Sequence, residues 1–392
     1  MSGSTATRTR ATYVAAIALT VILVWTTARV HYAFGGNWTA LFCTGANFPV
    51  PPDLEPGTYR FQGAGYDGQF YRYLAHDLLL RKDYFRYVDA PQVRFRRVLV
   101  SLAAWLVAFG QPRWIDTAYI AVEMFCIALG TYWCARLLAR RGLSTLWGLL
   151  FVLVPATLAS FDRMLVDGPL TALFAGFWLY SEEKRWTRVW LLAMLAALTR
   201  ETGLLLSAAL VADQLVTHEV LERHWRKAAC FAASSLPALT WYAYLALRLP
   251  NRPQITELGV PVWGLLSRLL LFRPYPDPRI QLLLRVTDFL AVLGLAISIV
   301  LAILWLARER VGPVTICIGL YAVLALLLSS PSYMTEALGY GRPVSPLLLW
   351  IMIEAVSRRT WMALTPPLLV SLRVSLVFAS PLFTVLKGLL GR

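Results

Sequence analysis

The feature that most restricts the fold of this chain is a series of apolar runs, each close to the length needed to cross a bilayer. A transmembrane helix requires about 20 predominantly apolar residues. So many runs of this length cannot all be buried in one soluble core. The sequence therefore predicts an all-α, polytopic membrane protein with roughly 10–12 transmembrane helices. The runs lie near residues 11–33, 115–135, 143–161, 164–180, 187–217 (long enough for two crossings), 228–247, 286–307, 311–329, 343–356 and 361–386.

The composition agrees with this class and excludes others. Of the 392 residues, 58% are hydrophobic and only 15% are charged. The net charge of +15 does not indicate a nucleic-acid partner, because membrane proteins retain Lys and Arg on their cytoplasmic face. Of the five cysteines only Cys43 lies outside an apolar run, so neither a disulfide framework nor a zinc site is expected.

The membrane topology of the rest of the chain depends on one apolar segment, residues 98–109. It is too short to span a bilayer, and it follows Arg94, Arg96 and Arg97, which are expected to bind anionic lipid headgroups. We therefore predict a helix lying on the membrane surface. Counting this segment as a span would reverse the side of every later loop.

The distribution of basic residues supports this choice. Arg8 and Arg10 precede a first run with no small-residue cleavage site, so an uncleaved span with a cytoplasmic N-terminus is expected. Connections 136–142, 181–188, 218–227, 308–310 and 357–360 then lie inside and carry 13 Lys and Arg, against three in the short outer connections. Each short outer connection holds one arginine, as the positive-inside rule requires.

Two long segments, 34–97 and 250–285, then lie on the outer face. The second contains an apolar piece, 260–272, that is predicted to form another surface helix. On this basis the chain divides into residues 1–217, a membrane region that includes the loop 34–97, and residues 218–392, a second transmembrane half that includes the loop 250–285.

With this topology, the ionisable residues near membrane depth gather at the outer face. Such residues are functional candidates, because burying them must be offset by a partner or a ligand. A carboxylate in a glycine-flanked turn can take a proton from a hydroxyl, arginines can bind phosphate, and tyrosines can hold a sugar. The candidates, with the tyrosines and amide beside them, are Tyr66, Asp67, Gln69, Tyr71, Tyr73, Asp162, Arg163, Asp167, Arg200, Glu201, Glu336, Tyr340 and Arg342.

Two stretches carry a resemblance to a known family: Gly-Tyr-Asp-Gly-Gln-Phe-Tyr at 65–71 and Arg-Phe-Arg-Arg-Val-Leu at 94–99. They resemble bacterial multi-pass membrane proteins related to the GT-C glycosyltransferases. Those enzymes use polyprenyl-phosphate sugars and carry an acid in the first outer loop, followed by a juxtamembrane helix. The resemblance covers the chain from its first span to about Gly203. It implies a GT-C-like fold, with Asp67 in the place of the catalytic acid.

The same resemblance implies further roles. Asp162 or Asp167 takes the place of the acid of the second outer loop, and Arg200 or Arg342 that of the donor-phosphate ligand. Many relatives have paired acids in the first loop, whereas here Asp67 is followed by Gly68. A divalent cation therefore has no paired-acid motif to support it, and no metal ligand is assigned.

The leading hypothesis is an inverting glycosyltransferase of the cytoplasmic membrane, with its site on the outer side. It moves a sugar from a polyprenyl-phosphate carrier to a hydroxyl on a glycan, lipid or protein. Asp67 is the expected base. The residues expected to bind substrate are Tyr66, Gln69, Tyr71, Asp162, Arg163, Asp167, Arg200, Glu201, Tyr340 and Arg342. The alternatives are a lipid-linked saccharide transporter or flippase, and a non-catalytic assembly subunit with a GT-C fold. His76 is expected at the boundary of the site, and Asp288 as a buried polar contact.

Overall fold

The computed structural model describes residues 2–216, 221–250, 258–271, 278–330, 334 and 337–390. Within these ranges the chain is helical. Its strand-type pairing there is limited to three isolated bridges, Thr44–Gly65, Gly45–Phe61 and Leu258–Leu328. The prediction of an all-α protein is therefore confirmed.

The α-helices and 3-10 helices follow one another along the chain. The α-helices are α1 (Ser2–Phe34), α2 (Gly68–His76), α3 (Pro91–Arg94), α4 (Leu99–Val107), α5 (Pro112–Arg140), α6 (Leu150–Leu153), α7 (Pro155–Arg163), α8 (Asp167–Glu182), α9 (Trp186–Thr199), α10 (Leu204–Val216), α11 (Leu221–Ala232), α12 (Leu236–Arg248), α13 (Trp263–Leu270), α14 (Pro278–Leu306), α15 (Pro313–Leu327), α17 (Ala337–Gly341), α18 (Ser345–Ser357), α19 (Thr365–Ser375) and α20 (Ala379–Leu389). The 3-10 helices are η1 (Trp38–Phe42), η2 (Tyr84–Tyr87), η3 (Thr145–Leu149), η4 (Glu201–Gly203), η5 (Ala233–Ser235), η6 (Trp361–Leu364) and η7 (Leu376–Phe378).

Among the described residues, five helical segments are long and apolar enough to cross a membrane, which indicates a membrane protein. They are Ala6–Phe34, Pro112–Arg140, Trp225–Arg248, Ile280–Leu306 and Trp361–Leu389. A sixth crossing is formed if Thr145–Leu153 and Pro155–Arg163 act together, although the two are bent by 64°. The bend has a local cause. Pro155 has no N–H for the helix ladder, and it holds Val154 in an extended conformation.

The other expected spans are shorter helices. α8, α9, α10, α15 and α18 have 16, 14, 13, 15 and 13 residues. At 1.5 Å per residue, 14 residues cover about 21 Å, which is less than the hydrocarbon core. Charged residues stand where three of them begin or end: Asp167 opens α8, Arg200 follows α9, and Arg342 precedes α18. The total of ten to twelve crossings stays a prediction.

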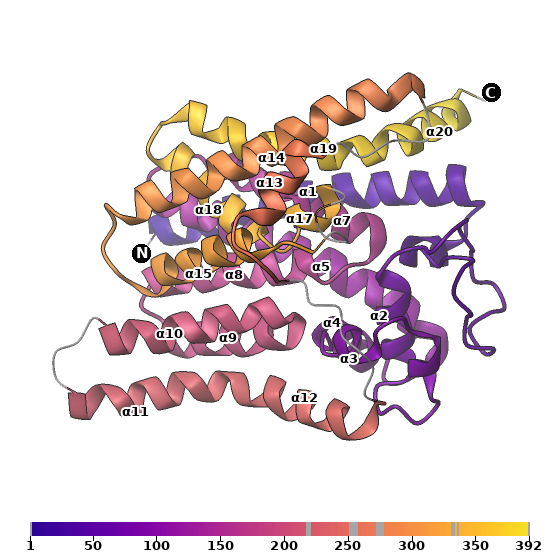
Figure 1. Cartoon of the computed structure of the whole chain (residues 1–392), viewed down its shortest axis with the longest axis horizontal. Helices are drawn as coiled ribbons and strands as arrows, with labels where there is room; N and C mark the ends of the chain where they lie inside the picture. The colour runs from indigo at the N-terminus through magenta and orange to yellow at the C-terminus, as the bar shows by residue number, and fades with distance from the viewer. Residues whose placement is uncertain are drawn as a thin grey trace.

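The bundle has two ends, and each holds its own set of charged residues. In Figure 1 the long helices run side by side across the view. The N-terminus lies at one end, and the segment that carries α2, α3 and α4 lies at the other. At the first end, Arg141 after α5 pairs with Glu182 of α8 and Glu354 of α18, both at 2.7 Å. Arg358 pairs there with Glu309. These connections are among those that the charge pattern groups together.

Two short helices match the predicted surface helices. α4 has nine residues, about 14 Å, so it is too short to cross a bilayer. It packs against α5 and α2 through Val100 and Ala104, while Leu106 and Val107 are exposed. α13 has eight residues and lies within the expected piece 260–272.

The loop that precedes α4 is a folded unit with its own hydrophobic core. Phe70, Tyr73 and Leu74 of α2 pack together with Val50 and with residues of α12. Gly65 permits a tight turn at φ +68°, where a side chain would collide with the backbone of Gly45. The loop is therefore a rigid support for the residues that follow it.

Labelling with a membrane-impermeant maleimide tests whether the two ends of the bundle lie on opposite sides of the membrane. Exposed Glu55 of the first loop and exposed Arg310 after α14 are each replaced by Cys in a Cys230→Ser background. In intact cells Glu55→Cys is expected to react, whereas Arg310→Cys reacts only after permeabilisation. Reaction of both from the same side would contradict the arrangement.

Candidate functional site

Asp67 lies where the first loop enters α2, and its side chain is not used to cap that helix. The carboxylate instead turns toward arginines from two distant parts of the chain. Its Oδ2 lies 2.9 Å from Nη1 of Arg94 and 3.8 Å from Nη1 of Arg342. The Asp67 side chain keeps 16% of its surface exposed, so it remains within reach of a ligand.

Arg94 is held on both sides. Beyond Asp67 it donates to the two carboxylate oxygens of Asp89 at 3.1 and 2.9 Å, and its guanidinium lies over the Phe70 ring. Binding of lipid headgroups by Arg94 and Arg97 stays a prediction. In the structure both contact carboxylates of the chain, Arg94 from α3 and Arg97 from the segment between α3 and α4.

Arg342 links Asp67 to a second, fully buried group. Its Nη1 lies 3.2 Å from Oδ2 of Asp167, and its Nε donates to the carbonyl of Leu338 at 2.6 Å. Asp167 also pairs with Arg200, and both of these side chains are 2% exposed. Residues of α3, α2, α8 and the ends of α9 and α17 thereby form one network, which we call the Asp67 network: Arg94, Asp67, Arg342, Asp167 and Arg200.

Asp162 belongs to a neighbouring group. It accepts hydrogen bonds from Arg29 of α1 and, at 3.2 Å, from Arg163. The ring of Tyr66 joins this group to the Asp67 network, because the guanidinium carbons of Arg163 and Arg342 lie 4.4 and 5.0 Å from its centroid. Such contacts favour a cation over an aromatic face.

A third group lies beside Arg200. Arg97 donates to Glu201 at 3.1 Å and to the hydroxyl of Tyr71 at 2.8 Å, and it is 2% exposed. Tyr71 is itself fully buried, so its structural effect is to orient Arg97. Burial raises the pKa of the Tyr71 hydroxyl, which keeps it protonated.

The arginines set the charge of the carboxylates. Burial alone would raise the pKa of Asp67, but Arg94 and Arg342 outweigh it and the pKa lies below its usual value. Burial likewise opposes Arg97 and Arg200 at Glu201, and its pKa is also lowered. Both groups are therefore ionised at neutral pH.

Two further candidate residues, Gln69 and Tyr340, are buried. The Gln69 amide accepts from the backbone N–H of Gly45 at 3.2 Å and donates to the carbonyl of Ala64 at 3.0 Å. It is fully buried and both of its amide atoms bond to the loop backbone, so in this structure it fastens the loop. Tyr340 is fully buried in α17. Glu336 lies outside the described residues.

Gly68 occupies a position where the surrounding backbone leaves no room for a side chain. A Cβ at this position would collide with the backbone carbonyl of Arg163 and approach that of Phe42. The start of α2 therefore packs directly on the end of α7. An acidic side chain has no room at this position.

Some members of these groups were not anticipated. Arg29 could have been found, because an arginine near the end of an otherwise apolar span requires a partner. His76 lies 3.0 Å from Asp116, which also binds Arg72, so it belongs to a separate contact between α2 and α5. Asp288 is a buried polar contact as expected: it pairs with two arginines, Arg268 and Arg373.

Comparisons of the chain with protein families, with characterised proteins and with solved structures find no match. The site is therefore interpreted from its own geometry. Within the described part of the chain, no three His, Cys, Asp or Glu side chains come together as a metal-binding group. The carboxylates described above face arginines.

Replacing Gly68 by Ala is expected to lower the free energy of unfolding by about 1–3 kcal/mol, the usual cost of overpacking. The added methyl group meets backbone, which cannot move aside as a flexible side chain would. Unfolding in mixed micelles measures the change. Gly312→Ala is the control, because nothing lies within 4 Å of a Cβ there. Equal stability of the two variants would contradict the packing of α2 on α7.

Acid should destabilise the protein through Asp67 and Glu201. Their pKa values are lowered by folding, so the stabilisation is present above the unfolded values of 3.8 and 4.5 and is lost as pH falls through the folded ones. We expect the midpoint temperature of thermal unfolding to decrease when the pH is lowered below about 4. Asp67→Asn should reduce this fall, whereas the exposed Asp83→Asn should not. An identical pH profile in both variants would rule out the contribution of Asp67.

Proposed function

We propose that the protein is an inverting glycosyltransferase that takes a sugar from a polyprenyl-phosphate carrier and transfers it to a hydroxyl acceptor. One observation carries the proposal: the partly exposed carboxylate of Asp67 lies near Arg342, whose other carboxylate partner, Asp167, is buried. A base and a phosphate ligand are thus adjacent. Both are needed when a hydroxyl displaces a sugar from a phosphate.

In the proposed reaction the acceptor oxygen attacks the anomeric carbon while Asp67 takes its proton. The bond from that carbon to the carrier phosphate breaks, and the phosphate leaves with the bonding electrons. A single displacement of this kind inverts the configuration at the anomeric carbon. The lowered pKa of Asp67 supports a carboxylate that is ionised before the acceptor binds.

Arg342 and Arg200 are the proposed phosphate ligands. Arginine offers a planar fork that matches phosphate oxygens and keeps its charge at all relevant pH values. Asp167 holds both arginines in place, and Arg342 also bonds to the backbone of Leu338. Preorganised donors of this kind stabilise the negative charge that develops on a leaving phosphate. A phosphate would also compete with Asp67 for Arg342, which would release the base.

Tyr66 is the proposed contact for the sugar. Its ring lies between the cations of Arg163 and Arg342, next to the carboxylate of Asp67. Asp162 and Arg163 come from the C-terminal end of α7 and would border the same space. The fully buried Tyr71 is proposed as a positioning residue that acts through Arg97.

One observation favours a second candidate, the non-catalytic assembly subunit. Asp67 is already paired with Arg94 at 2.9 Å, and a carboxylate with a lowered pKa is a weaker base. A subunit of this kind would bind polyprenyl phosphate through the same arginines and transfer nothing.

The proposal is tested by offering the purified protein a panel of radiolabelled polyprenyl-phosphate sugars together with membrane extract. Wild-type protein should transfer one of them. Asp67→Asn should lose at least about 10²-fold in rate, because a general base contributes 10²–10⁴-fold. Asp83→Asn is the matched control, since this acid forms an exposed pair with Arg86 in the same loop.

Abundance and thermal midpoint are recorded for each variant, so that misfolding is not mistaken for lost chemistry. Wild-type rates in folded Asp67→Asn would eliminate the mechanism. Binding of polyprenyl phosphate without transfer by the wild-type protein would support the non-catalytic subunit.

A further inference from the structure

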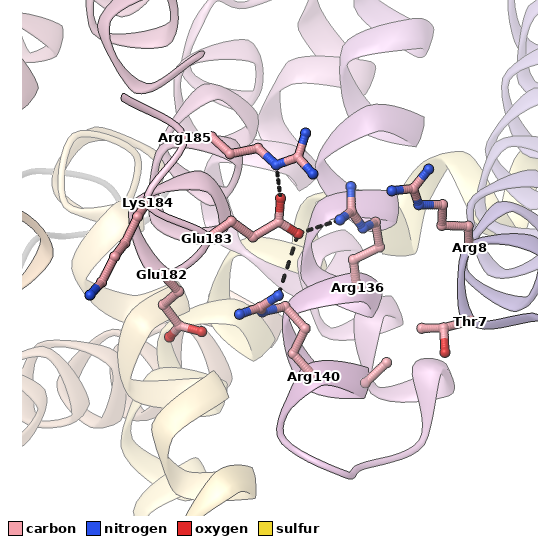
Figure 2. Close-up of a pocket in the computed structure, with 9 residues that line it drawn as sticks. Thr7, Arg8, Arg136, Arg140, Glu182, Glu183, Lys184 and Arg185 are labelled. Carbon is pink, nitrogen blue, oxygen red and sulfur yellow. Dashed lines mark hydrogen bonds and ion pairs between the residues drawn. The ribbon is translucent and has the colours of Figure 1, made fainter. Parts of the chain in front are cut away.

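A second polar cavity lies at the end of the bundle opposite Asp67. It encloses about 520 Å³ between the start of α1, the end of α5 and the turn from α8 to α9 (Figure 2). Its principal charged residues are Arg8, Arg136, Arg140, Glu183 and Arg185. We call this the arginine cavity.

Glu183 organises the cavity. Its carboxylate pairs with Arg136, lies 3.1 Å from Nε of Arg185 and lies 3.6 Å from Nη1 of Arg140. The Glu183 side chain is 7% exposed, so its position is fixed by its surroundings. One carboxylate cannot use all the N–H donors of three guanidinium groups, each of which has five.

Arg136 is prepared for a further anion. Its side chain is 11% exposed, and its guanidinium carbon lies 5.8 and 6.0 Å from the ring centroids of Tyr132 and Tyr180. Because these contacts hold the side chain in place, little rotamer entropy remains to be lost when a ligand binds. An arginine that is partly removed from water also interacts more strongly with a negative charge.

Arg8 brings a fourth positive charge to the cavity. Its guanidinium lies beside that of Arg136 (Figure 2), and no ion pair is seen between it and another described residue. The neighbouring Glu182 does not balance it, because Glu182 accepts hydrogen bonds from Arg141 and from Trp178. Four arginines therefore surround one glutamate, an arrangement that an added anion would stabilise.

The general excess of Lys and Arg at this end does not account for such a cluster. Elsewhere at this end, Arg358 pairs with both Glu309 and Glu354, and Arg141 pairs with Glu182 and Glu354. Those sites match cations with carboxylates.

The length of α1 matches a bilayer with the cavity at one face. α1 places Arg8 in the cavity and Arg29 against Asp162 at the opposite end. Their separation of 21 residues corresponds to about 32 Å of helix, close to the ~30 Å of a hydrocarbon core. A phosphate on a lipid or in solution can therefore reach the arginines.

We infer that the arginine cavity binds a phosphate group, with Arg8, Arg136 and Arg140 as ligands and Glu183 as the residue that spaces them. Guanidinium forks match phosphate oxygens. A free dianionic phosphate would offset two of the three surplus positive charges, and the monoanionic phosphate of a phospholipid headgroup would offset one. The phosphate is that of an anionic phospholipid headgroup or a free phosphate. This inference does not depend on the transfer reaction at Asp67.

The experiment measures ligand binding to the purified full-length protein by native mass spectrometry and by thermal shift. The probes are dioleoylphosphatidylglycerol, dioleoylphosphatidylcholine and inorganic pyrophosphate. Arg8→Ala and Arg140→Ala are each expected to weaken binding of the anionic probe about tenfold, because each removes a charge-assisted hydrogen bond. Both residues are solvent-exposed enough for the variants to fold.

Arg10→Ala is the matched control, since it removes the same charge two residues away on α1, outside the cavity. Preference for phosphatidylglycerol without competition from pyrophosphate supports a lipid headgroup. Competition by pyrophosphate supports a free phosphate. Equal weakening by Arg8→Ala and Arg10→Ala, or no binding of either anionic probe, would overturn the inference.

Discussion

The rest of the structure depends on the ion pairs that the helices bury at one end of the bundle. Asp167 and Arg200 are 2% exposed, and removing one partner from such a pair leaves a buried charge at a cost of about 3–5 kcal/mol. Pairing fixes where α8 begins and where α9 ends. It also draws Arg342 from the far half of the chain to the first loop, so the two halves meet at the site rather than forming separate units.

Several features of this arrangement could be predicted from the sequence. Apolar runs determine where helices lie, and the uneven distribution of Lys and Arg groups their ends, because both depend on one-dimensional patterns. The short helices α4 and α13 followed from length alone. Asp67 and Arg342 were identified as candidates because ionisable residues at membrane depth require partners.

Other features required three dimensions. Nothing in the local sequence distinguishes Gln69, whose amide fastens backbone, from a ligand-binding amide. The pairing of Arg94 with Asp67 depends on how α3 folds back along the loop. The role of Gly68 became clear only from the carbonyl of Arg163, which lies 95 residues further along the chain.

The length of α1 has a consequence for the membrane in which the protein works. One stiff helix holds the arginine cavity and the Asp162 group about 32 Å apart. In a thinner bilayer both sets of charges could not stay at headgroup level unless the helix tilted, and in a thicker one the lipid would have to compress. Each Å of such hydrophobic mismatch costs a fraction of a kcal/mol. The protein would therefore partition toward membranes whose hydrocarbon thickness matches this distance.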